Sequence, residues 1–211
     1  MLANLIVTNN TEYLEQTIES VSKNGDTFVV FDGIKPIDGN FTALTCNANS
    51  SAVARKTGIE VIAKKPQYQF IQFIDSDDFV TSSPIPYLTD GYDLFYSDFL
   101  VKNEDFEYTY TEYLQSACFD NMRFLPFKIK NPVIRTARFL AKNGLKIDPN
   151  LRLFSITDLI YQIGQQSMFH IPHALYTCRI HSKMNSRLVS EKERLNCLSI
   201  IKGRLNGKIS V

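Results

Sequence analysis

Three carboxylates stand within four residues, at Asp75, Asp77 and Asp78, directly after the apolar run 68–74. Acids this close repel one another strongly in a partly dry cleft. A hard divalent cation such as Mn²⁺ or Mg²⁺ relieves the repulsion, and these cations bind one or two carboxylates together with substrate phosphates. The cluster therefore predicts a site for Mn²⁺ or Mg²⁺ and a phosphorylated ligand. The alternative is an acidic turn that only solvates the end of a strand.

The elements before this cluster predict where it lies in the fold. Short apolar runs at 4–8, 27–31, 68–74 and 93–96 are typical of buried strands. Helical patterns separate them at 14–21 and 50–65. This alternation predicts an α/β fold, with a mostly parallel, Rossmann-like sheet flanked by helices. The acids then lie at the carboxyl end of a parallel strand, where ligands bind in open α/β sheets.

The second half of the chain predicts a smaller, irregular and partly helical region. We expect one helix from about residue 132 to 140, and a second over 155–166 capped by Ser155. Beyond residue 171 the pattern is irregular. A basic tail follows, which we interpret as the solvated face of a helix, with contact to an anionic acceptor as the alternative. Its members are Lys192, Arg194, Lys202, Arg204 and Lys208.

Composition narrows the class of protein. The 211 residues are 44% hydrophobic and 21% charged, which fits one globular domain with its own core. A net charge of +1 does not indicate nucleic acid as a partner, although it does not exclude it as an acceptor. The four cysteines are far apart and predict free thiols. No segment approaches the roughly 20 apolar residues of a membrane span, so we expect a soluble, cytoplasmic protein.

Several segments, in order along the chain, resemble family 2 glycosyltransferases, which have the GT-A fold. Residues 5–10 and 12–21 are similar to that family's first strand and helix. Residues 29–33 resemble its second strand, 54–59 its Ala-Arg-Asn-x-Gly stretch, and 73–79 its Asp-x-Asp-Asp (DXD) motif. Residues 93–98 are similar to the strand that follows, and 176–186 resemble its closing Tyr-x-x-Arg-x-His-x-x-x-x-Ser segment.

The resemblance implies an activity. It implies a metal-dependent, inverting transferase that moves a sugar from a nucleotide-diphosphate donor to an acceptor hydroxyl. A UDP-sugar is the favoured donor, and the acceptor is a glycan or another hydroxyl-bearing molecule. Residues 1–100 would form the donor-binding half of the single domain, and residues 101–211 the acceptor-binding half with the tail.

The resemblance also implies roles for particular residues. Asp77 and His181 would be metal ligands, with His181 a phosphate donor or a structural residue as alternatives. Asp158 would be the general base, or else an ordinary first-turn aspartate favoured by the helix dipole. The implied donor-binding residues are Asp32, Arg55, Asp75, Asp78 and Arg179. A turn-forming Asp32 and a solvated Arg55 are the alternatives for two of them.

Two positions depart from the family pattern. Phe31 replaces the first acid of the second-strand pair, which bears on nucleobase recognition, and Thr157 replaces the glutamate beside the expected base. A sugar-phosphate nucleotidyltransferase is a rival, but it needs a glycine-rich basic loop after the first strand, and residues 8–11 contain no glycine. A non-catalytic sugar-nucleotide-binding module of the same fold is the other rival.

Overall fold

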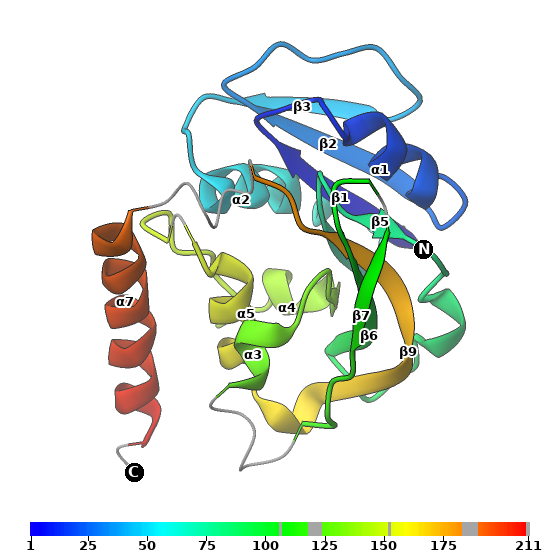
Figure 1. Ribbon diagram of the computed structural model, residues 1–211. Helices are drawn as coiled ribbons and strands as arrows, with labels where there is room; N and C mark the ends of the chain where they lie inside the picture. The colour runs from blue at the N-terminus through cyan, green and yellow to red at the C-terminus, as the bar shows by residue number, and fades with distance from the viewer. Residues whose placement is uncertain (106, 118–123, 152, 183–189, 210–211) are drawn as a thin grey trace.

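The computed structural model describes residues 1–105, 107–117, 124–151, 153–182 and 190–209. Over these residues the chain forms a curled nine-stranded sheet flanked by helices (Figure 1). The strands are β1 (Leu2–Thr8), β2 (Asp26–Asp32), β3 (Thr42–Cys46), β4 (Phe70–Asp75), β5 (Phe79–Val80), β6 (Leu94–Lys102), β7 (Tyr108–Glu112), β8 (Val133–Arg135) and β9 (Met168–Arg179). The α/β class predicted from the sequence is confirmed.

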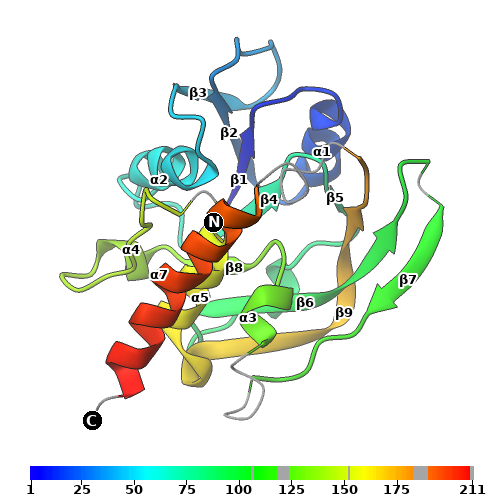
Figure 2. The same ribbon diagram turned by 60° about the vertical axis from the view of Figure 1, so that its left-hand side comes forward.

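The first half of the chain builds a parallel layer. Strands β3, β2, β1 and β4 are neighbours in that order and run parallel. Nearly every residue of β1 and β2 is buried, as expected for strands covered on both faces. The covering helices are α1 (Leu14–Val21) and α2 (Ser51–Ile62), which lie on opposite sides of these strands (Figure 2).

Beyond β4 the sheet is mixed. The three-residue strand β8 is antiparallel to both β4 and β6, and β6 is parallel to the long strand β9. Strands β5 and β7 are antiparallel to β9 and β6 respectively. The parallel arrangement expected for most of the sheet therefore holds for β3-β2-β1-β4. The later strands are connected by turns, by the β6–β7 hairpin and by segments that carry short helices. The antiparallel pairs among them do not require a helical crossover.

The remaining helices accompany this mixed region, and they range from single turns to one helix of 19 residues. They are η1 (Ile85–Tyr87), α3 (Leu125–Lys128), α4 (Ala137–Leu140), α5 (Ser155–Ile163), η2 (Gln165–Ser167) and α7 (Glu191–Ile209). Helix α7 packs beside α3 and α5 through the buried side chains of Cys197 and Ile201 (Figures 1 and 2). Lys192, Arg194 and Lys202 are exposed, as expected for a solvated face. The side chains of Arg204 and Lys208 lie outside the described part.

Three local predictions for the second half are wrong. The helix expected from about residue 132 is instead strand β8, followed only by the single turn α4. Helix α5 begins at Ser155, but its N-cap is Phe154 in a left-handed conformation (φ 61°), with no side-chain cap. Ser155 instead accepts a hydrogen bond from Arg55. The irregular region expected after residue 171 is largely the extended strand β9.

Two further expectations concern the whole chain. Cys46, Cys178 and Cys197 are free thiols, while Cys118 lies outside the described residues. Within the described residues, no helix has both the length and the apolar character needed to cross a membrane.

Candidate functional site

The acidic cluster forms a tight turn at the carboxyl end of β4. Asp75 is the last residue of the strand, and the backbone N–H of Asp78 donates to the carbonyl of Asp75 at 3.0 Å. The hydroxyl of Thr17, on α1, lies 2.9 Å from the carbonyl of Ser76 and 2.8 Å from that of Asp78. The turn is therefore held against α1, at the edge of the sheet where the sequence predicted the site.

Asp78 faces the interior. It is 3% exposed, and its two carboxylate oxygens accept from the Asn131 side-chain amide at 2.9 Å and from the backbone N–H of Arg179 at 3.3 Å. Burial, followed by the charges of Asp77 and Asp75, raises the pKa of Asp78 well above its ordinary value. The predicted donor-binding carboxylate of Asp78 is thus enclosed between β8 and β9.

Asp77 and His181, the two predicted metal ligands, meet directly. The Nε2 atom of His181 lies 2.8 Å from an Asp77 carboxylate oxygen, although 104 residues separate them in the sequence. The imidazole packs edge-on against Tyr13, with 5.1 Å between ring centroids. Burial, and then the charge of Asp75, raises the pKa of Asp77. These two effects outweigh the favourable contact with His181.

Asp75 is paired with Arg55. An Arg55 guanidinium nitrogen lies 2.8 Å from an Asp75 carboxylate oxygen, and another donates to the Ser155 hydroxyl at 2.9 Å. The Asp75 side chain is nevertheless 42% exposed, so it remains open to a ligand. Arg55 therefore joins α2, the end of β4 and the start of α5, and it is not the solvated arginine that the sequence allowed.

Lys130 is a charged residue of this region that the sequence did not indicate. It is partly buried and directly precedes Asn131. Burial alone would lower the pKa of its ammonium group, but the carboxylates of Asp75 and Asp78 outweigh that effect and raise it. The acidic cluster therefore already contains a positive charge supplied by the protein.

Arg179, predicted to bind the donor, directs its side chain toward α1. Its guanidinium stacks on the ring of Tyr13 at 4.0 Å and donates to the Gln16 side chain at 2.6 Å. Burial lowers the pKa of Arg179, although not enough to make an arginine neutral near pH 7. Its backbone touches Asp78, as described above. Arg179 and His181 thus both lie against Tyr13, at the rim of the acidic turn.

Asp32, at the end of β2, lies in a different environment. Its carboxylate is 6% exposed and accepts three backbone N–H groups, from Ala48 at 2.8 Å, Asn49 at 3.0 Å and Ser50 at 2.7 Å. Burial works to raise its pKa, but these hydrogen bonds and one from the Cys46 thiol outweigh it and lower the pKa. This geometry favours anchoring of the loop before α2. The adjacent Phe31 is fully buried in the core.

The predicted base, Asp158, lies in the first turn of α5 and is 2% exposed. One carboxylate oxygen accepts from the Gln162 side-chain amide at 2.9 Å. The neighbouring Thr157, at the position of the family's glutamate, is also buried, and its hydroxyl reaches the Pro126 carbonyl at 3.3 Å. The start of α5 is linked to the acidic turn through Ser155 and Arg55.

The donor atoms fit a divalent cation in part. Asp77 and His181 bring a carboxylate oxygen and an imidazole nitrogen within 2.8 Å of each other. Among the residues that the structure describes, no three Asp, Glu, His or Cys side chains converge to hold a metal ion. Two protein ligands would suit a cation whose remaining positions are filled by phosphate oxygens and water.

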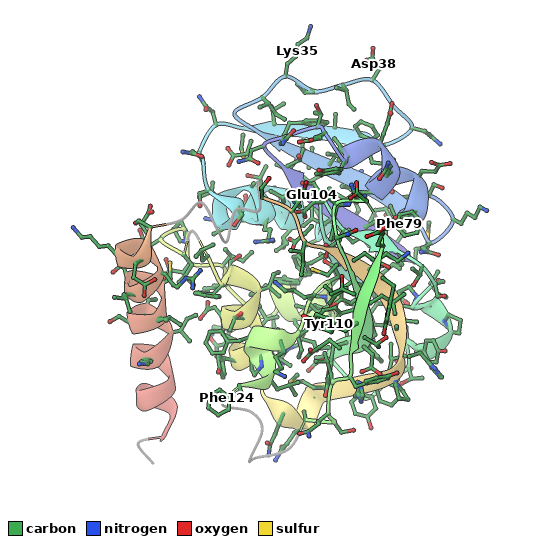
Figure 3. The ribbon with its side chains drawn as sticks, in the orientation of Figure 1. Lys35, Asp38, Phe79, Glu104, Tyr110 and Phe124 are labelled. Atoms are coloured by element: carbon green, nitrogen blue, oxygen red, sulfur yellow. The ribbon has the colours of Figure 1, made fainter. Side chains whose placement is uncertain are left out.

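The β6–β7 hairpin contacts the chain beside His181, at the rim of the acidic turn. Glu104, labelled in Figure 3 at the tip of the hairpin, accepts from the backbone N–H of Ser182 at 2.6 Å. This contact fixes the backbone directly after His181. The rest of the closing segment that resembles the family, residues 183–186, lies outside the described residues.

The comparisons with known proteins place the fold. The structure resembles that of residues 1–349 of TarS from S. aureus in complex with UDP, with a TM-score of 0.67 and 14% sequence identity. The match covers 95% of this chain and 64% of the TarS chain, so the present chain spans less than two thirds of it. A longer TarS structure matches with a TM-score of 0.66 over 38% of its length. The fold is therefore GT-A-like.

Comparisons of sequence give no further assignment. No protein-family model matches the chain. No curated protein matches it either.

Proposed function

We propose that this chain is a glycosyltransferase of the family 2 type, which uses a nucleotide-diphosphate sugar as donor. The observation that carries the proposal is the meeting of Asp77 and His181 at 2.8 Å, at the carboxyl end of β4. This edge of an open α/β sheet is the usual place for nucleotide ligands. The likeness of the fold to TarS, whose structure holds UDP, supports a UDP-sugar as the donor.

The chain's own residues divide the work of holding the donor. Asp75, partly exposed and oriented by Arg55, would accept hydrogen bonds from the ribose hydroxyls. Arg55 donates to Asp75 at 2.8 Å, and the charge of Lys130 also interacts with that of Asp75. Both cations would attract the diphosphate. Residues 1–100 would supply most of the donor site, joined by Lys130 and His181, and the rest of residues 101–211 would bind the acceptor glycan or other hydroxyl compound.

Asp77 and His181 are the residues that would hold Mn²⁺ or Mg²⁺. When bound, such a cation would act as a Lewis acid on the leaving diphosphate. The raised pKa of Asp77 supports this role, because burial and the neighbouring Asp75 disfavour its charge and a bound cation would favour it. Negative charge builds up on the diphosphate as its bond to the sugar breaks. Arg55 and Lys130 would further balance this charge.

Asp158 is the proposed base for an inverting, single displacement. In this role its carboxylate takes the proton of the acceptor hydroxyl as that oxygen attacks the anomeric carbon from the face opposite the diphosphate. In the free protein Asp158 is buried beside Gln162. Acceptor binding must therefore open its surroundings, and catalytic contacts commonly tighten only in the substrate complex.

The test is release of UDP from a panel of UDP-sugars, measured with Mn²⁺, with Mg²⁺ and with EDTA. We expect metal-dependent release from one sugar, lost in Asp77→Asn and kept in Asp38→Asn, which changes an exposed loop acid. Metal-dependent binding of UDP without release would instead favour the non-catalytic module. Absence of both binding and release would contradict the proposal.

A further inference from the structure

The acidic turn is held from its far side by Asn131. This residue lies two positions before the short strand β8 and is 8% exposed. Its side-chain oxygen accepts from the backbone N–H of Asp75 at 3.2 Å, and its side-chain nitrogen donates to the carboxylate of Asp78 at 2.9 Å. One amide therefore spans both ends of the turn that carries Asp77.

The two contacts need both functions of an amide group. The N–H of Asp75 requires an acceptor, whereas the buried carboxylate of Asp78 requires a donor. Asp78 is already disfavoured as a charge by its burial and by its acidic neighbours, and the hydrogen bond from Asn131 works against that effect. An aspartate at position 131 would keep the acceptor and lose the donor. It would also add a fourth carboxylate to the cluster.

The backbone of Asn131 is itself unusual. Its φ angle is +43°, in the left-handed region that few side chains adopt without cost. Asparagine tolerates this region better than most residues. Backbone strain of this kind persists where surrounding contacts impose it, and it concentrates at functional sites. Here the imposing contacts are the two hydrogen bonds to the acidic turn.

We propose that Asn131 is a positioning residue of the acidic site. Its amide fixes the Asp75–Asp78 turn so that Asp77 meets His181 and Asp75 meets Arg55. Thr17 holds the same turn from α1, but it reaches only backbone carbonyls, whereas Asn131 also controls the buried carboxylate. This inference rests on the proposed function, because the geometry that Asn131 maintains is the one that would hold the cation and the diphosphate.

The test compares three variants of the full chain, Asn131→Asp, Asn131→Gly and Asn49→Gly. Asn49 is the matched control, since it also has a positive φ (48°) but its side chain is exposed. UDP is titrated calorimetrically in the presence of Mn²⁺, at a temperature where thermal unfolding scans show each variant fully folded. Glycine adopts φ +43° freely, so Asn131→Gly removes the amide without adding backbone strain.

We expect both Asn131 variants to bind Mn²⁺–UDP about 10- to 100-fold more weakly than the wild type, as for loss of a hydrogen bond to a charged group. The Asn49 variant should bind as the wild type does. If Asn131→Gly does not fold, Asn131→Asp decides, because aspartate also tolerates the left-handed region.

Wild-type affinity in the folded Asn131 variants, with or without a lower unfolding temperature, would overturn the inference and leave Asn131 a purely structural residue. If the wild type itself binds no UDP, the proposed function fails and the inference fails with it. The two failures are distinguishable in one set of titrations.

Discussion

The ends of β2 and β4 lie at the same edge of the parallel layer. Each end carries aspartates, but their pKa values are shifted in opposite directions. At the end of β2, Asp32 accepts three backbone N–H groups and has a lowered pKa. At the end of β4, Asp77 and Asp78 have raised pKa values because burial and mutual repulsion outweigh their hydrogen bonds. The fold favours the charged form of Asp32, whereas it disfavours the charged forms of Asp77 and Asp78.

The difference separates a structural acid from a binding site. A carboxylate whose hydrogen-bonding capacity is used by the backbone contributes stability and has little left for a ligand. Carboxylates with raised pKa values cost stability until a cation or donor reaches them, and such perturbed groups gather at functional sites. We therefore propose a ligand-binding role for the acids at the end of β4 and a structural role for Asp32.

The largest effect that would test this contrast is on folding. Asp32→Ala leaves three backbone N–H groups without their acceptor, and we expect the free energy of unfolding to fall by about 2–4 kcal/mol. That corresponds to a drop in Tm of roughly 5–15 °C for a domain of this size. Asp38→Ala, in the exposed loop after β2 (Figure 3), is the control and should change Tm little. Equal Tm values for the two variants would remove the structural role of Asp32.

The next effect is on binding. Asp77→Asn removes the charged ligand while keeping the shape of the side chain, so affinity for Mn²⁺–UDP should fall by roughly 100-fold, or ~2.7 kcal/mol. Isothermal titration of both proteins under the same conditions measures it. A variant that binds as tightly as the wild type would move the binding site away from the end of β4.

A smaller effect is expected at Lys130. Replacement by methionine keeps much of the apolar stem but removes the charge that faces Asp75 and Asp78, so we expect UDP affinity to fall about 3- to 10-fold. The salt dependence of UDP binding should also weaken, since one cation fewer faces the diphosphate. Unchanged affinity and unchanged salt dependence would mean that Lys130 only balances the charge of the acids.

The smallest effect is a gain in stability with a defined pH dependence. The pKa of Asp77 is higher in the folded chain than in the unfolded chain, so the unfolded chain loses the Asp77 carboxyl proton first as pH rises. Asp77 therefore destabilises the fold progressively as pH rises above about 3.8. Asp77→Asn should therefore raise Tm near pH 7 by roughly 2–4 °C, on the order of 1 kcal/mol, and by less near pH 4. Asp32 has the opposite sign, since its stabilisation is present above about pH 3.8 and is lost as pH falls through its lowered pKa. A Tm difference for Asp77→Asn that shrinks as pH rises would contradict the assigned direction.

Elements with a strong local pattern were predictable from the sequence. The continuous apolar runs of β1, β2 and β4 predict strands, and the apolar stripe of α1 predicts a helix. Together they predict the edge of the sheet where Asp75 and Asp77 lie. The pairing of Asp77 with His181 came from the resemblance to a family rather than from any local signal, since 104 residues separate the two.

Features set by tertiary contacts were not predictable. Strand β8 has only three residues, and the sequence around it favours a helix. Its pairing with β4 and β6 makes it a strand. Strand β9 passes Pro172 through a register shift opposite Ser97 and Asp98, so its sequence does not alternate regularly. Lys130 and Asn131 carry no motif, and only the folded chain brings them to the acidic turn.

The most direct test of the central claim is calorimetric titration of the wild-type protein with UDP, in Mn²⁺, in Mg²⁺ and in EDTA. The account predicts saturable binding of UDP with one of the two cations, at least 10-fold weaker in EDTA, or about 1.4 kcal/mol. Equal affinity in EDTA would contradict the metal role of Asp77 and His181, and no binding under any condition would contradict a nucleotide site at the end of β4.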